Sequence, residues 1–230
     1  MVCLGRLSLT REIGEGGKRP GEETFQVRKD LNRFRRLRGE RRYRKLFVLA
    51  TEGSKTEPQY FALVESLLSG IHVKCLSTGR GSAPPRVLAR MKEYLRRETL
   101  RHGDEAWLVV DKDQWSDDQL GVLHEWTRGN AKHSQQRGLA LSNPCFEVWL
   151  LLHFEDAAGV TSSDDCVSRL RKCIPGYDKD VCSRWFSLDK IRDAVRRARH
   201  GDHPPCEDWP RIPGHTTVYR LVERMLDCIT

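Results

Sequence analysis

Three carboxylates in this sequence stand where a folded sheet would bring them together. Glu52 follows an apolar run at residues 46–50 that is typical of a buried strand. Asp111 and Asp113 begin where a second apolar run, residues 106–110, ends. Ligands of open parallel sheets bind at the carboxyl ends of the strands. Residues two apart on an extended segment point the same way, so both aspartates are expected to face one ion together with Glu52.

Such a group of carboxylates predicts a hard divalent cation. Converging carboxylates repel one another strongly unless a cation neutralises them. Oxygen ligands with no Cys or His nearby favour Mg²⁺ or Mn²⁺, which often share a phosphate with their protein ligands. The alternative is structural, with Glu52 and Asp111 capping adjacent helices and Asp113 in a solvated turn. A bound Mg²⁺ polarises a phosphoryl oxygen and lowers the pKa of an attacking water, so no nucleophilic side chain is required.

The positive charge of the chain is concentrated in one short segment. The net charge is +8. Residues 28–45 carry ten basic side chains against two acidic ones, so the rest of the chain is balanced. A basic arm on a neutral body suits a polyanion, most often nucleic acid, because contacts to phosphate release condensed counterions. The alternative is a solvated basic helix, or one that docks on an acidic partner protein. The nucleic-acid-binding candidates are Arg35, Arg36, Arg38, Arg41, Arg42, Arg44 and Lys45.

An alternation of strands and helices must position these residues. Apolar runs predict strands covered on both faces, at residues 46–50, 71–76, 106–110 and 138–141. Amphipathic stripes and capping signals predict helices after each strand, at about residues 56–70, 86–100, 119–126 and 144–154. Four successive strand–helix units imply a parallel sheet with right-handed crossovers. The fold class is therefore α/β, with a four-stranded parallel sheet flanked by helices and a C-terminal helical extension. The expected strand order is 2-1-3-4, the order in which strands one and three are neighbours and their carboxylates converge.

The composition changes along the chain suggest four segments. Residues 1–27 are rich in glycine and poor in large apolar side chains, which predicts disorder. Residues 157–230 show no strand pattern, contain amphipathic helices at residues 187–199 and 217–228, and have little core of their own. The segments are a disordered lead at 1–27, the basic arm at 28–45, a metal-binding core at 46–156 and a helical extension at 157–230, packed on the core.

Several classes of protein are excluded by composition. The longest apolar runs have five residues, whereas a membrane-spanning helix needs about 20. The N-terminus lacks the apolar stretch of a secretory signal, so a cytoplasmic protein with no membrane partner is expected. The eight cysteines are then expected to be reduced thiols. A zinc site at His200, His203 and Cys206, closed by Cys182, is the less favoured alternative to a polar loop.

The Glu-Gly and DxD patterns resemble the Toprim metal site of topoisomerases, primases and several nucleases. Four longer blocks are similar to the successive blocks of the RloB-like family: LFVLATEGSKTEPQYF at 46–61, WLVVDKDQW at 107–115, LALSNPCFEVWLLLHF at 139–154 and TTVYRLVERM at 216–225. The resemblance implies a Toprim-like core and a role in bacterial antiphage or restriction-linked defence, commonly beside an ATPase of the ABC or AAA type. The sequence departs from the family's usual pattern at Thr51 and at Gly214-His215.

The resemblance also implies roles for individual residues. Glu52, Asp111 and Asp113 would be the metal ligands, and Lys55, in the loop after the first strand, a phosphate or transition-state contact. The resemblance brings in Gly53 as a secondary candidate. Two further candidates, Asn143 and Glu147, follow the fourth strand on the same sheet edge, where Asn143 is expected to cap a helix whose N-terminus favours anions. His153, near the far end of that helix, is expected to be a hydrogen-bonded core or surface residue rather than a proton carrier.

Taken together, these patterns predict a Mg²⁺- or Mn²⁺-dependent nuclease acting on DNA or RNA. The resemblance adds an ATPase as its partner. The competing hypothesis is a non-cleaving effector that binds nucleic acid or an ATPase and uses the acidic cluster structurally. The sequence offers no convincing Ser/His/Asp or Cys/His nucleophile. The chain is also too short for a topoisomerase or a complete primase.

Overall fold

The computed structural model describes residues 44–77, 83–113, 115–129 and 136–228. The chain divides into two units, Met1–Arg42 and Tyr43–Thr230. The first unit lies outside the described residues, so the predicted disordered lead and most of the basic arm lie there too.

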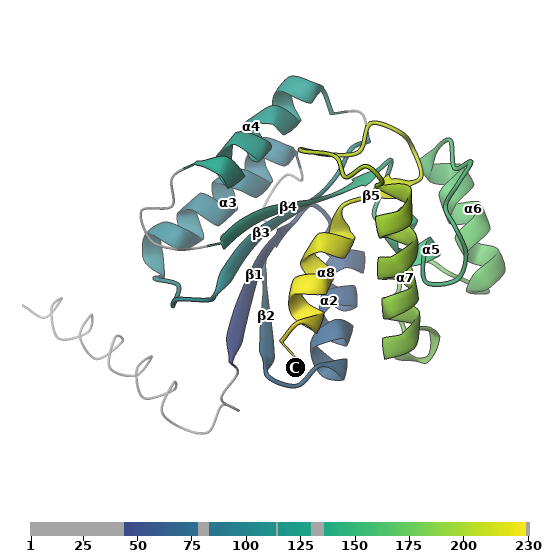
Figure 1. The fold of residues 1–230 in the computed structure, drawn as a ribbon, viewed down its shortest axis with the longest axis horizontal. Coiled ribbons are helices and arrows are strands. Elements are labelled where there is room, and N and C mark those ends of the chain that lie inside the picture. Colours follow the sequence, from purple (N-terminus) through teal and green to yellow (C-terminus); the bar gives the residue numbers. More distant parts are fainter. Residues whose placement is uncertain (1–43, 78–82, 114, 130–135, 229–230) are drawn as a thin grey trace, which may run out of the picture. The chain divides into compact units, whose positions relative to one another are not determined.

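A mostly parallel sheet forms the centre of the second unit (Figure 1). Its strands are β1 (Lys45–Thr51), β2 (Ile71–Leu76), β3 (Glu105–Asp111), β4 (Gln136–Asn143) and β5 (His215–Thr216). The order is β2-β1-β3-β4-β5, in which the first four strands are parallel and β5 pairs antiparallel with β4. The predicted order 2-1-3-4 is confirmed. The prediction that the C-terminal segment contains no strand is wrong, because β5 is too short to show an alternating pattern in the sequence.

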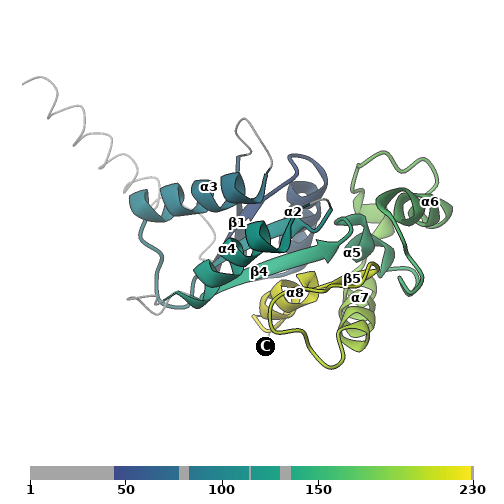
Figure 2. The same cartoon turned by 90° about the horizontal axis from the view of Figure 1, so that it is seen from above.

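Helices cover both faces of the sheet. They are α2 (Thr56–Leu67), α3 (Pro84–Arg97), α4 (Asp117–Arg128), α5 (Glu147–Leu151), α6 (Ser163–Cys173), α7 (Leu188–Gly201) and α8 (Val218–Leu226), with a 3-10 turn at Ser183–Trp185. In Figure 1, α3 and α4 lie on one face, and α2, α7 and α8 on the other. Figure 2 shows α5 and α6 beyond the carboxyl end of β4. The mixed α/β class is thus confirmed.

The sheet is buried on both faces, as its continuous apolar strands require. In β1, Phe47 and Leu49 pack into the hydrophobic core shared with α2, α5 and the C-terminal helices. Their neighbours Leu46, Val48 and Ala50 pack into a second core with α3 and α4. Successive side chains of a strand point to opposite faces, so one apolar run supplies both cores.

The C-terminal segment joins the sheet through its edge strand β4. The backbone N–H of Thr217 donates to the Leu141 carbonyl oxygen at 2.8 Å, and the buried hydroxyls of Ser142 and Thr216 lie 2.8 Å apart. In α8, Val218 has no exposed surface. These contacts make the helical extension part of the same core as α2 and α5.

The segment between β4 and α6 differs from the prediction. A helix beginning at Pro144 was expected, but α5 contains only five residues, Glu147–Leu151, and its N-cap is Phe146. Asn143 therefore does not cap a helix. Its amide nitrogen donates to the Pro210 carbonyl oxygen at 3.1 Å, and its own carbonyl oxygen accepts from the N–H of Gly214 at 2.7 Å.

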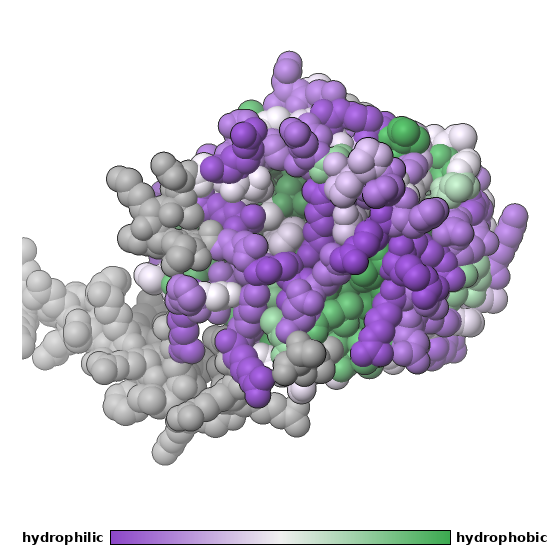
Figure 3. Space-filling view, viewed as in Figure 1, coloured by the Kyte–Doolittle hydropathy of each residue, from purple (hydrophilic) through white to green (hydrophobic). Residues whose placement is uncertain are grey.

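The surface seen in Figure 3 is mostly hydrophilic, and its hydrophobic band follows the seam between α7 and α8. Among the described helices, none combines the length and the apolar composition needed to cross a lipid bilayer.

Candidate active site

A cavity of about 280 Å³ opens at the carboxyl edge of the sheet, where the chain leaves β1 and β3. The strand order reverses between these two strands, and open α/β sheets bind ligands at such a point. The walls come from the turn after β1, the first turn of α2, the end of β3, the start of α5 and the segment before the 3-10 turn. The lining residues are Glu52, Gly53, Ser54, Lys55, Thr56, Glu57, Asp111, Phe146, Glu147 and Lys179.

Glu52 is held in place by three hydrogen bonds. Its backbone N–H donates to the Val109 carbonyl oxygen at 2.9 Å, which fixes the turn against β3. Its carboxylate accepts from the backbone N–H of Asp111 at Oε2 and from the indole N–H of Trp115 at Oε1, each at 3.1 Å. Burial raises the pKa of Glu52, and these two donors partly offset that effect. Both carboxylate oxygens are therefore oriented before any ligand binds.

Asp111 ends β3 and is the carboxylate most affected by its surroundings. Burial raises its pKa well above the ordinary value, and repulsion from Glu57, Glu52 and Glu147 adds to the effect. These three neighbours line the same cavity as Asp111. The cavity thus concentrates negative charge in a place with little water to solvate it.

Glu57 was not among the residues singled out from the sequence. It lies in the first turn of α2 and is only 5% exposed. Its Oε1 accepts from the backbone N–H of Gly53 at 2.9 Å. Burial raises the pKa of Glu57, and repulsion from Glu147 contributes.

Gly53 is required by this close approach. A Cβ atom at Gly53 would lie 2.2 Å from Oε2 and 2.7 Å from Oε1 of Glu57. Any other residue would displace the carboxylate, so the secondary candidate Gly53 has a steric role in the site.

Glu147, the other secondary candidate, lies in the cavity wall. It is the first residue of α5 and is 7% exposed. The hydroxyl of Tyr177 donates to its Oε1 at 3.1 Å. Glu147 therefore faces Glu57 and Asp111, although more than 30 residues separate it from either one in the sequence.

Asp113 does not share the cavity, contrary to the expected geometry. The chain turns directly after Asp111, where the N–H of Lys112 donates to the Ser142 carbonyl oxygen at 2.7 Å. Asp113 then has φ +32°, so it is not extended, and its side chain is exposed. The rule that residues two apart point the same way applies only within a strand. Asp113 is near enough for its charge to raise the pKa of Glu52.

Lys55 lines the cavity as expected, but its ammonium already has partners. Nζ lies 3.0 Å from Oδ1 of Asp180 and 3.3 Å from the Asp178 carbonyl oxygen. Both charged side chains are largely exposed, and such pairs contribute little stability. Breaking this pair would therefore cost little stability.

Only two of the basic-arm candidates fall within the described residues. Arg44 is exposed. Lys45, by contrast, is the first residue of β1, and its Nζ lies 2.5 Å from Oε1 of the buried Glu105, which Arg224 also contacts at 2.6 Å. Lys45 thus has a structural partner. The other five, Arg35, Arg36, Arg38, Arg41 and Arg42, lie outside the described residues.

The proposed zinc alternative is not assembled. In the described part of the chain, no group of three or more His, Cys, Asp or Glu is arranged to hold a metal ion. The N–H of Cys206 donates to Asp202 at 2.9 Å, and its sulfur accepts from Arg220 at 3.4 Å. These contacts match the polar loop that was favoured.

The same finding bears on the acidic cavity. Among the described residues, its carboxylates do not form a ready-made metal site, so an ion would have to draw them together. The donor set nevertheless fits Mg²⁺ or Mn²⁺, because Glu52, Glu57, Asp111 and Glu147 offer only oxygen. The raised pKa values of the first three show the electrostatic cost that a cation would relieve.

The sequence carried a weak signal for Glu57, which was missed, and for Glu147, which was only a secondary candidate. Each stands in the first turn of a helix that follows a strand, so each helix starts at the carboxyl edge of the sheet. An acidic residue there is also favoured by the helix dipole, which made a purely local role equally reasonable.

Comparison with known proteins gives one result. The family model described as RloB-like protein matches residues 47–225. No curated protein and no solved structure matches the chain. The matched range contains β1 from its third residue, the whole acidic cavity and α8 up to Met225. The chain therefore belongs to the RloB-like family.

Proposed function

We propose that this protein is a metal-dependent nuclease that hydrolyses phosphodiester bonds of DNA or RNA. The observation that supports it is the cavity in which Glu52, Asp111 and two further glutamates meet at the switch point of the sheet. Buried carboxylates of raised pKa are unfavourable without a counter-charge and are found preferentially at functional sites.

In this proposal, Glu52 and Asp111 hold Mg²⁺ or Mn²⁺, with Glu57 or Glu147 as further ligands. When bound, the metal would polarise the phosphate and acidify a water. Trp115 orients Glu52, Tyr177 orients Glu147, and Lys55 is placed to contact phosphate. Asp113, which the sequence predicts as a third metal ligand, would have to move from its exposed turn into the cavity to reach the metal.

We also propose, from the family resemblance, that the protein acts in bacterial antiphage defence in the cytoplasm, together with an ATPase of the ABC or AAA type. The basic residues of the arm would supply contacts to nucleic acid. A pull-down of the tagged protein from the cells in which it occurs, followed by mass spectrometry, tests the ATPase partnership.

The nuclease proposal is tested with Asp111→Asn. The substitution removes one negative charge from a crowded cavity, so the metal-free variant should melt at the wild-type temperature or above it. The stabilisation by Mn²⁺ should shrink, because less metal binds the folded state. Cleavage of labelled DNA and RNA in Mg²⁺ should be lost.

The matched control is Asp118→Asn, an exposed first-turn residue of α4. It should leave cleavage and the Mn²⁺ response unchanged. Wild-type cleavage by Asp111→Asn in saturating Mg²⁺ would refute the proposal, and equal Mn²⁺ responses of wild type and variant would favour the non-cleaving effector.

A further inference from the structure

One wall of the acidic cavity comes from the C-terminal extension. The segment 176–181, between α6 and the 3-10 turn, supplies Lys179, the only lining residue from beyond α5. Lys179 lies more than 30 residues after Glu147 in the sequence and brings a positive charge to a cavity of carboxylates. Its charge lowers the pKa of Glu57, so the two groups are close enough to interact.

Segment 176–181 is tied to the start of α2 by several hydrogen bonds. The hydroxyl of Thr56 donates to the Lys179 carbonyl oxygen at 3.1 Å, and the N–H of Val181 donates to Oε1 of Gln59 at 2.9 Å. The ion pair of Lys55 with Asp180 adds a third contact. Lys179 is therefore held at the cavity by its backbone, independently of its side chain.

The side chain of Lys179 differs from that of Lys55. Within the described part of the chain, the structure gives Lys55 an ion pair with Asp180 but gives the Lys179 ammonium no ion pair. The side chain of Lys179 is also exposed. Lys179 thus has a cation that a phosphate can reach without first displacing a carboxylate.

The backbone of Lys179 is unusual as well. Its φ is +59°, in the left-handed region, which costs a non-glycine residue about 1 kcal/mol. A glycine or an asparagine would adopt this conformation more readily. The stability of the turn therefore gives no reason for a lysine at this position.

We propose that Lys179 binds the phosphate of the nucleic-acid substrate at the metal cavity, as a further residue of the active site. The inference rests on the proposed nuclease function. A lysine ammonium acts as a point charge towards phosphate oxygens. Beside a metal held by Glu52 and Asp111, it would neutralise charge on the same phosphate. The helical extension then contributes directly to substrate binding in addition to packing on the core.

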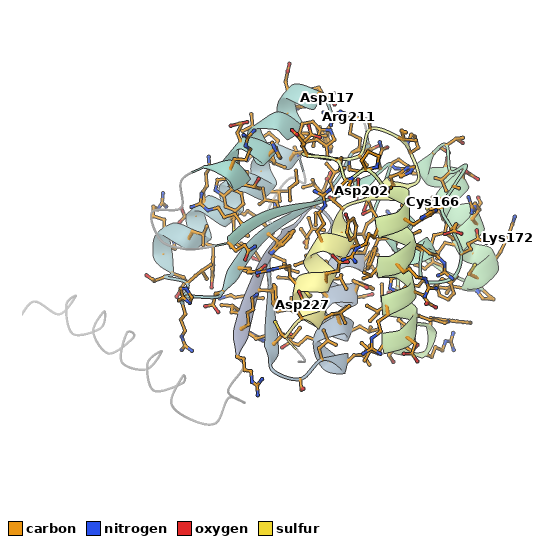
Figure 4. The ribbon with its side chains drawn as sticks, viewed as in Figure 1. Asp117, Cys166, Lys172, Asp202, Arg211 and Asp227 are labelled. Atoms are coloured by element: carbon orange, nitrogen blue, oxygen red, sulfur yellow. The ribbon has the colours of Figure 1, made fainter. Side chains whose placement is uncertain are left out.

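Lys179→Gly is the sharpest test. It removes the ammonium and also removes the left-handed strain, so the variant should fold with nearly wild-type stability. Lys179→Arg keeps the charge. Lys172→Ala is the matched control, since Lys172 is an exposed lysine of the same extension that points outward from α6 (Figure 4).

Binding is measured by fluorescence anisotropy with fluorescein-labelled single-stranded DNA and RNA of one sequence, in Ca²⁺, over a range of salt concentrations. Losing one phosphate contact should reduce the slope of log K against log salt by about 0.7. We expect this for Lys179→Gly, with at least a tenfold loss of kcat/KM in Mg²⁺. Lys179→Arg and Lys172→Ala should keep the wild-type slope.

The outcomes separate this inference from the proposed function. If wild type cleaves, and Lys179→Gly cleaves equally well with an unchanged salt slope, the inference is refuted and the nuclease proposal stands. If wild type binds without cleaving and Lys179→Gly shows the smaller slope, the phosphate contact is supported and the nuclease proposal fails. A wild-type protein that neither binds nor cleaves would refute both.

Discussion

Gly53→Ala should disturb the acidic cavity without replacing an ionisable residue. The new Cβ would lie 2.2 Å from Oε2, 2.7 Å from Oε1 and 2.8 Å from Cδ of Glu57, where 3.4 Å or more is ordinary contact. The carboxylate must therefore retreat by roughly 1 Å, the difference between those distances. That movement breaks the 2.9 Å hydrogen bond from the Gly53 N–H to Glu57.

The size of the effect follows from that bond. A hydrogen bond to a charged group contributes about 1.5–3 kcal/mol, and each 1.4 kcal/mol changes an affinity tenfold. If Glu57 helps to hold the ion, Mn²⁺ affinity should fall roughly tenfold to a hundredfold. The folded state should change little in stability, because the displaced carboxylate also escapes repulsion from Glu147 and Asp111.

Titration calorimetry with Mn²⁺ measures this directly. Gly121→Ala is the matched control: the glycine lies in α4, and a Cβ there would meet nothing within 4 Å. The control should bind Mn²⁺ as wild type does and gain about 0.5–1 kcal/mol of helix stability. Equal Mn²⁺ affinities for wild type and a folded Gly53→Ala would show that the position of Glu57 is irrelevant to the metal.

Two further predictions concern a positioning residue and a buried histidine. Trp115→Phe removes the 3.1 Å hydrogen bond to Glu52 and should weaken Mn²⁺ binding about tenfold, as measured by calorimetry. Trp209→Phe is the control, because the indole N–H of Trp209 has no hydrogen-bond partner in the described structure, and it should bind Mn²⁺ as wild type does. Equal losses of affinity in the two variants would point to a general packing effect. Burial lowers the pKa of His153 from 6.5 to about 3. Below pH 6.5 the unfolded chain therefore takes up a proton at His153 that the folded protein does not, and the folded state loses stability as the pH falls from 6.5 towards 3. Between pH 7 and pH 5, urea unfolding should show wild type losing about 2 kcal/mol more than His153→Gln; parallel losses would mean that His153 titrates normally in the folded state.

The interior environment of His153 also illustrates a prediction that was confirmed. It is 2% exposed, with Nδ1 2.9 Å from the Trp149 carbonyl oxygen and Nε2 3.1 Å from the Tyr60 hydroxyl. The carbonyl accepts only, so Nδ1 carries the proton and Nε2 accepts from Tyr60. This core histidine is neutral, and both of its ring nitrogens already have hydrogen-bond partners, so it is not placed to carry protons in catalysis.

Much of the fold could be predicted because burial leaves a local trace. A strand covered on both faces is apolar throughout, and the runs at 46–50 and 106–110 correspond to the centres of β1 and β3. The alternation with amphipathic helices then limits the connections to right-handed crossovers. Glu52 and Asp111 were placed correctly at the cavity because each directly follows or ends such a strand.

The remaining composition of the cavity depended on contacts between distant segments, which no local sequence pattern indicates. Asp113 leaves the cavity because backbone hydrogen bonds to Ser142 and Pro144 turn the chain after β3. Glu147 and Lys179 enter it only through the packing of α5 and the binding of segment 176–181 to α2. Residue type and spacing therefore determined which edge of the sheet carries the acids, whereas the tertiary structure decided which charged groups meet there, because their distances are set by packing between segments far apart in the chain.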